Sequence, residues 1–246
     1  MAVQRLIYGR RLGHRLRPER RRLLTERLPE LRVTPPVEGQ IEPRRWFDPA
    51  PREVWLEIGF GGGEHLAALA ASHPKIGFIG CEPYIGGVAR LLGLLDAQRS
   101  TNVRLVVDDA RILLRALPDR AIARLFVLFP DPWPKTRHHK RRIVNPSTAA
   151  EFARLLEPGG ELRLATDDMD YARAMLQALR PRSELSWRAE RPLDWRTRPA
   201  DWPPTRYEQK AIAAGRRCVY LRFRRLPDRA VSNGEKSLKG RGETPI

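Results

Sequence analysis

The sequence predicts an α/β protein whose sheet is mostly parallel, carries helices on both faces and includes an antiparallel pair of strands near the C-terminus. Short apolar runs alternate with helix-like stretches through the middle of the chain, and a glycine-rich turn follows the first of these runs. The last apolar run alternates with arginine. Continuous apolar runs are typical of parallel strands covered on both faces, whereas alternation is typical of a strand with one face in water.

Five continuous apolar runs predict the parallel strands, at residues 53–59, 76–81, 103–107, 124–129 and 161–166. Two later segments, near residues 185–189 and 219–224, alternate apolar with polar side chains. We expect these two segments to pair with each other, antiparallel, at an edge of the sheet.

The segments between the apolar runs are predicted to be helices. From Glu64 to Ser72 the leucines fall on one helical face. The clearest helix spans residues 145–157: Asn145 can cap it, Pro146 suits its first position, and the Pro-Gly-Gly at residues 158–160 ends it.

Composition divides the chain into three regions. Residues 1–51 form a basic arm, with Pro18 expected to interrupt any helix there, followed by a proline-rich connection. Residues 52–225 hold the α/β domain. Residues 226–246 are polar and expected to be disordered. A disordered arm and an arm that contacts RNA both remain open.

Charge points to the class of partner. Lysine and arginine total 46 against 29 acidic residues, which gives a net charge of +17. This charge favours a polyanionic binding partner, and nucleic acid is favoured over a membrane surface. Two distant cysteines predict neither a disulfide framework nor a metal site. Without a long apolar run or a secretory leader, we expect a cytoplasmic protein, monomer or homodimer, with no membrane, metal or obligate protein partner.

The glycine turn indicates a cationic ligand. The segment EIGFGGG places Glu57 two residues before Gly59, and Gly61 follows, but the spacing fails the dinucleotide fingerprint because Glu64 stands where its last glycine should be. A carboxylate at this place disfavours a pyrophosphate and attracts a cation. A turn that binds nothing is the alternative.

Further acids follow the next strands. Glu82 comes after the second predicted strand, Asp108 and Asp109 after the third, and Asp131 after the fourth. Each alone is more simply a helix cap. Together, at the carboxyl edge of a parallel sheet, they predict a pocket for a ligand that carries a ribose, an amine and a sulfonium.

The segment LFPDPWPKTRHHKRR, residues 128–142, joins a proline-stiffened acidic loop to a basic run. Taken alone, its basic half would be a solvated face. Its position after a strand favours instead a site that handles a cation and a polyanion together. Trp133 could stack on an exposed base or pack beneath the loop.

These motifs resemble known families. EIGFGGG with Glu82 and Asp109 is similar to the S-adenosylmethionine site of Rossmann-like methyltransferases. FPDPWPK, LATDD at 164–168 and TRYEQK at 205–210 resemble the bacterial tRNA (guanine-N7)-methyltransferases, over about residues 9–225. The resemblance implies a Rossmann-like methyltransferase fold and methyl transfer from S-adenosylmethionine to N7 of a guanosine at position 46, in the variable loop of tRNA.

The resemblance also implies roles for individual residues. Asp131 would lie at the catalytic centre as well as against the cofactor. The cofactor-binding residues would be Glu57, Gly59, Gly61, Glu82, Asp109 and Asp131. The residues that contact tRNA would be Lys135, Asp167, Thr205, Arg206, Tyr207 and Glu208.

The implied chemistry needs no general base, because guanine N7 attacks with an in-plane lone pair and loses no proton. Asp131 would stabilise the positive charge as it moves from the sulfur to the purine. Glu208 would accept hydrogen bonds from guanine N1-H and N2-H, unless it pairs with Arg206 or Lys210. The arm and the basic run at 135–142 would hold phosphates, so tRNA affinity should fall steeply with salt.

Two other functions fit parts of the sequence. A methyltransferase for a small molecule or a protein would share the cofactor site but would not need so basic a surface. An RNA-binding protein with an inactive pocket would keep the charge and lose affinity for S-adenosylmethionine. A titration with S-adenosylmethionine distinguishes the RNA-binding protein, which would not bind it, from either methyltransferase. A panel of substrates distinguishes a methyltransferase for a small molecule or a protein from one for tRNA.

Overall fold

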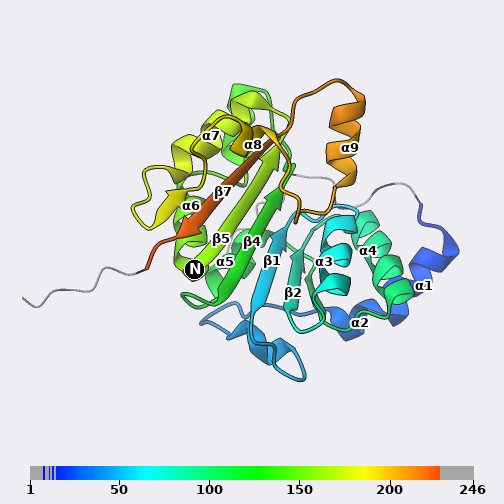
Figure 1. The fold of residues 1–246 in the computed structure, drawn as a ribbon. Coiled ribbons are helices and arrows are strands. Elements are labelled where there is room, and N and C mark those ends of the chain that lie inside the picture. The colour runs from blue at the N-terminus through cyan, green and yellow to red at the C-terminus, as the bar shows by residue number, and fades with distance from the viewer. Residues whose placement is uncertain (1–7, 9–10, 12, 14, 228–246) are drawn as a thin grey trace, which may run out of the picture.

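A seven-stranded sheet in the order β3-β2-β1-β4-β5-β7-β6 runs through the part of the chain that the computed structural model describes, residues 8, 11, 13 and 15–227 (Figure 1). Its parallel strands are β1 Val54–Ile58, β2 Gly77–Cys81, β3 Val103–Val106, β4 Ile122–Leu128 and β5 Leu156–Thr166. Its antiparallel strands are β6 Leu185–Trp187 and β7 Val219–Arg225. The predicted fold class and the closing antiparallel pair are confirmed.

Helices cover both faces of this sheet (Figure 1). Within the described residues the α-helices are α1 Pro18–Glu26, α2 Leu28–Leu31, α3 Glu64–Ser72, α4 Ile85–Gln98, α5 Ala110–Ala116, α6 Pro146–Leu155, α7 Met169–Leu179, α8 Leu193–Arg196 and α9 Arg206–Ala213. The same described part of the chain holds two 3-10 helices, η1 Pro43–Trp46 and η2 Thr136–Arg141.

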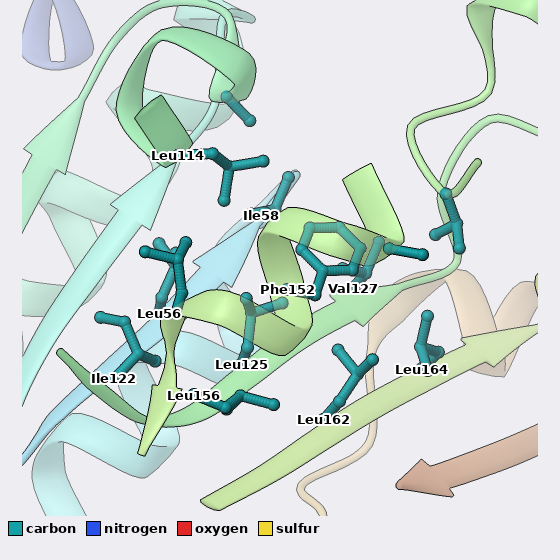
Figure 2. Close-up of a cluster of buried hydrophobic side chains, with 14 of the residues drawn as sticks. Leu56, Ile58, Leu114, Ile122, Leu125, Val127, Phe152, Leu156, Leu162 and Leu164 are labelled. Atoms are coloured by element: carbon teal, nitrogen blue, oxygen red, sulfur yellow. The ribbon is translucent and has the colours of Figure 1, made fainter. Parts of the chain in front are cut away.

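Alternate residues of the strands supply two separate cores. Leu56 of β1 and Leu125 of β4 point to the face covered by α5, α6 and α7, where they meet Phe152 (Figure 2). Trp55 and Phe126, one position away, point to the opposite face, covered by α1, α3 and α4. Full burial of each large apolar side chain stabilises the fold by about 1.5–3 kcal/mol, so these two layers fix the sheet between its helices.

The predicted start of α6 is confirmed. Asn145 Oδ1 accepts hydrogen bonds from the backbone N–H groups of Ser147 and Thr148, at 3.0 and 3.2 Å, and Thr148 Oγ1 accepts one from Asn145 N at 3.1 Å. Pro146 stands at the first helical position. The helix ends two residues earlier than predicted, because β5 already begins at Leu156 and takes the Pro-Gly-Gly turn into a bulged strand.

The N-terminal region differs from its prediction. Pro18 begins α1 instead of interrupting a helix, since a proline at the first position removes an N–H that has no helical partner anyway. The buried Leu23 packs this helix against α4. Most of residues 1–14, and the tail at 228–246 that was expected to be disordered, lie outside the described residues. No described helix is long and apolar enough to cross a membrane.

Candidate active site

A pocket of about 360 Å³ opens at the carboxyl ends of β1, β2, β3 and β4. Parallel strands bring the loops that follow them to one edge of the sheet, so residues far apart in sequence line one cavity. Polar, glycine and aromatic residues contribute to its wall, among them Gly59, Gly61, Glu82, Tyr84, Asp109, Asp131, Trp133, Arg141 and Tyr207.

The glycine turn after β1 forms the floor of this pocket. Gly59 and Gly61 both have left-handed backbones, with φ of 73° and 56°, which side chains with a Cβ rarely adopt. The first turn of α4 packs directly onto it: a Cβ added to Gly87 would lie 2.1 Å from the Gly61 carbonyl oxygen. The turn is therefore fixed by close backbone contact.

Glu82 lies at the end of β2 and faces the turn. Its Oε2 accepts a hydrogen bond from Gly61 N and its Oε1 accepts one from Tyr84 N, both at 2.9 Å. Burial raises the pKa of this carboxyl, although the two backbone hydrogen bonds oppose that effect. Each carboxylate oxygen keeps a second lone pair, so Glu82 can still accept hydrogen bonds from a pair of ligand hydroxyls.

Asp109 serves as a helix cap and as pocket wall at once. Its Oδ1 accepts a hydrogen bond from Arg111 N at 2.9 Å, which caps α5, and the Arg111 guanidinium lies 3.2 Å away. The carboxylate is almost fully buried. The helix cap expected as the simpler interpretation is present, and the same residue lines the pocket, so its role as a ligand site stays a prediction.

Glu57, unlike Glu82, Asp109 and Asp131, does not line the pocket. It lies within β1, on the face opposite Ile58, and its Oε2 lies 2.8 Å from Nδ1 of His65 in α3. Both side chains are buried, and the His65 ring stands edge-on to Phe126. Sequence reasoning missed His65, whose only local signal is an imidazole in the first turn after the glycines.

The loop that carries Asp131 has a constrained backbone. Phe129 and Trp133 both have left-handed φ, at 50° and 47°, which costs free energy for residues other than glycine and is common at functional sites. Arg142 links this loop to α7: its Nε donates a hydrogen bond to Pro132 O at 2.8 Å, and its guanidinium pairs with Asp170 at 2.6 Å.

Arg142 is only 4% exposed. The expectation that every basic residue of the run at 135–142 would contact phosphates is therefore wrong for Arg142. Lys135, at the exposed start of η2, remains available to a polyanion. One buried arginine therefore fixes the loop, while its exposed neighbours present the charge.

The segment TRYE begins α9 above the pocket. Thr205 caps the helix by accepting from Glu208 N at 3.0 Å, and Arg206 is exposed. Tyr207 reaches down to the glycine turn, because a Cβ at Gly61 would lie 2.7 Å from its ring. Burial, together with the negative charges of Glu82 and Asp131, raises the pKa of the Tyr207 hydroxyl.

Glu208 points into the protein and is 3% exposed. Its carboxylate accepts hydrogen bonds from the hydroxyl of Tyr220 and from Thr205 N, and it lies 3.1 Å from Nε of Arg198. Neither Arg206 nor Lys210, the partners considered from the sequence, is its ion-pair partner. Contact with a guanine edge would require this carboxylate to leave the partners it has here.

Asp167, at the end of β5, pairs with Arg216 at 2.6 Å and does not line the pocket. Among the described residues, no cluster of three or more histidine, cysteine, aspartate or glutamate side chains is arranged to hold a metal ion. Cys81 and Cys218 are free thiols.

Comparison with known proteins adds independent information. A family model described as "Putative methyltransferase" matches residues 51–221. A tRNA (guanine-N(7)-)-methyltransferase of Rhodospirillum rubrum is 50% identical over 241 residues, which cover 96% of this chain and 93% of the relative. A protein of the same name from Ruegeria pomeroyi is 50% identical over 230 residues, 91% of this chain and 95% of the relative.

Solved structures agree on the fold. TrmN from Thermus thermophilus superposes with a TM-score of 0.51 at 16% identity, over 72% of this chain and 45% of that one. The 16S rRNA methyltransferase KamB superposes with a TM-score of 0.51 at 13% identity, over 79% of this chain and 98% of that one. At such low identity these structures show a shared methyltransferase fold and nothing further.

Proposed function

Because this chain belongs to the tRNA (guanine-N(7)-)-methyltransferase family, we propose that it transfers a methyl group from S-adenosylmethionine to N7 of the guanosine at position 46, in the variable loop of tRNA. The observation that carries the proposal is the pocket itself, in which a glycine turn, Glu82 and Asp109 lie beside the constrained loop at 129–134 that carries Asp131. A tRNA substrate places the reaction in the cytoplasm, and no obligate protein partner is proposed.

The residues present suit S-adenosylmethionine. When bound, S-adenosylmethionine supplies an electrophilic methyl group on a sulfonium. Glu82 is oriented by two backbone amides and would accept the ribose hydroxyls, while Asp109 closes the same end of the pocket. A Cβ added to Gly59 would meet nothing within 4 Å, so a ligand can approach its backbone closely, and Gly61 also lines the pocket.

Glu57 stays in the proposed cofactor-binding set because it lies at the base of the turn. Its Oε2 faces His65, so direct contact with the cofactor would use the other carboxylate oxygen. The net negative charge of Glu82, Asp109 and Asp131 favours a ligand that carries an ammonium and a sulfonium.

The chain's own residues would act by position and charge. N7 of guanine attacks through its lone pair, the N7–carbon bond forms as the sulfur–carbon bond breaks, and no proton leaves the base. Holding the reacting atoms in line can lower the barrier by about 7–11 kcal/mol. Asp131, exposed on its constrained loop, would stabilise the positive charge that develops on the purine.

Six residues are proposed to contact tRNA, and one of them, Tyr207, lines the pocket. Lys135 and Arg206 are exposed cations suited to phosphates, and the side chain of Tyr207 in α9 reaches the glycine turn. Thr205 and Glu208 begin the same helix, and Asp167 lies at the end of β5. We propose that these six residues together position the variable loop over the cofactor.

The test compares two tRNA transcripts that differ only at position 46, one with guanosine and one with adenosine. With labelled S-adenosylmethionine, the guanosine transcript should be methylated and the adenosine transcript should not. Equal labelling of both would contradict the assigned position. Even at saturating cofactor, the Asp131→Asn variant should lose most of its turnover; full turnover in this variant would remove Asp131 from the catalytic centre.

A further inference from the structure

Tyr8 from the N-terminal arm meets Trp133 and Arg141, both from the segment at residues 128–142, in the wall of the pocket. The central carbon of the Arg141 guanidinium lies 4.8 Å from the centroid of the Trp133 ring and 5.4 Å from the centroid of the Tyr8 ring. A flat cation therefore lies over two aromatic rings within the site.

The rings are the main partners of this guanidinium. Among the described residues no carboxylate forms an ion pair with Arg141, and its Nε is buried without a hydrogen-bond partner. The next residue is very different, since Arg142 has both a carbonyl and a carboxylate partner. Burying a polar nitrogen without a partner is unfavourable, so Arg141 is weakly held and easily displaced.

The place of these rings in the sheet shows which ligand they suit. Glu82 and Asp109 follow β2 and β3, on one side of β1, whereas Trp133 follows β4, on the other side. The ribose of the cofactor is assigned to the first side under the proposed function. The aromatic rings therefore lie on the side of Asp131, where the base that receives the methyl group has to enter.

We propose that Tyr8 and Trp133 form the stacking surface for the target guanine, and that Arg141 leaves the rings for a phosphate of the same nucleotide as the base enters. This inference rests on the proposed function and identifies how its substrate is held. A purine and a guanidinium are both flat and both stack on aromatic faces. The displaced guanidinium gains a phosphate partner that the free protein does not offer it.

The proposal makes the N-terminal arm part of the active site. Tyr8 belongs to that arm, and Arg11 tethers the arm to the start of α4, where its carbonyl oxygen accepts a hydrogen bond from Ile85 N at 3.0 Å. Gly13 lies against the ring of Tyr84, a second residue of the pocket wall. The arm is thus a structural component of the base site as well as a source of charge.

The experiment measures tRNA methylation and cofactor affinity in Tyr8→Ala and Tyr8→Phe. Loss of one base stack should lower kcat/KM for tRNA about 5- to 150-fold in Tyr8→Ala. Tyr8→Phe keeps the ring and should stay within about twofold of the wild type, and the Kd for cofactor should change by less than about twofold in both.

A second pair of variants tests the cation. Arg141→Ala should weaken tRNA methylation, whereas the matched control Arg196→Ala should not, although Arg196 also lies over a tryptophan, 4.6 Å from the ring of Trp195 and away from the pocket. Both substitutions remove one positive charge, so a general electrostatic effect would appear equally in both.

A binding measurement reports on the stack itself. A tRNA with 2-aminopurine at the target position should be quenched on binding wild-type protein and less quenched on binding Tyr8→Ala. Wild-type kinetics and quenching in Tyr8→Ala would overturn the assignment. So would a loss of cofactor affinity with unchanged tRNA kinetics, because the rings would then serve the cofactor's adenine. A wild-type protein that methylates no tRNA would overturn the proposed function first.

Discussion

Replacing Arg163 with methionine should destabilise the fold through the loss of one buried cation. Arg163 lies in β5 and is 2% exposed. Its guanidinium pairs with Glu161 at 2.6 Å and with Asp201 at 2.7 Å, and it lies near the rings of Phe126 and Trp202. Methionine preserves most of the apolar contact and removes all of the charge.

The expected cost follows from the partners left behind. Breaking a buried ion pair by removing one member typically costs about 3–5 kcal/mol. Here the cost should fall near about 3 kcal/mol, because Asp201 is 56% exposed and can turn to water, and Glu161 keeps Arg222 at 3.1 Å. For a chain of this size that corresponds to a fall in Tm of roughly 6–12 °C.

The effect should depend on pH. Burial raises the pKa of Glu161 and of Asp201, but the charge and hydrogen bonds of Arg163 outweigh it and hold both below their ordinary values. A depressed carboxyl pKa gives stability that is present at neutral pH and is lost as pH falls through the folded-state value. The difference between wild type and Arg163→Met should therefore shrink in acid.

Urea unfolding at neutral and acid pH measures this cost. The matched control is Arg222→Met, which breaks a pair whose arginine is 36% exposed and should cost less than about 1 kcal/mol. An Arg163→Met variant within about 0.5 kcal/mol of wild type would refute the reasoning, since the pair would then only balance its own desolvation. An equal cost in both variants would refute the role of burial.

Other predictions follow from the pocket. Because the pKa of Glu82 is raised, acidification should protonate this carboxylate, and so weaken cofactor binding, at a higher pH than for an ordinary glutamate. Titration calorimetry at several pH values measures the cofactor affinity. In Glu82→Gln the change of affinity with pH that comes from this group should be absent. Gly87→Ala should weaken cofactor binding at least about tenfold, because the added Cβ would displace the carbonyl of Gly61. The control is Gly93→Ala in the same helix, where the nearest atom to the added Cβ is 3.7 Å away and cofactor affinity should not change. Equal cofactor affinities in the two variants would contradict this. Glu208→Gln should destabilise the protein by about 1–3 kcal/mol in thermal unfolding and lower tRNA methylation with it, and wild-type stability would show that its internal partners matter little. Filter binding should show tRNA affinity falling steeply with salt, and a flat response would contradict phosphate contacts.

Local patterns predicted most of the fold because they report on local physics. The strands at β1 to β5 are apolar runs of strand length between helix-forming stretches, and the parallel arrangement follows from that alternation. The same arrangement gathers Glu82, Asp109 and Asp131 at one edge, which is why that part of the pocket could be predicted from spacing alone.

Long-range partners could not be predicted in this way. Nothing in the sequence around Arg142 marks it as buried among exposed cations, because its burial depends on Pro132 and Asp170. The pairing of Glu57 with His65 depends on which face of β1 a helix covers. Arg163 offered a signal, a cation between Leu162 and Leu164 of a predicted strand, which indicates a partner without identifying it.

The most direct test of the proposed function is methyl transfer to unmodified tRNA followed by borohydride reduction and aniline cleavage, which cuts RNA at N7-methylguanosine. We predict a single cut, at position 46 of the variable loop, that depends on both the protein and S-adenosylmethionine. Label incorporated into tRNA without this cut would contradict methylation at N7. Cofactor binding without any labelled tRNA would contradict tRNA as the substrate.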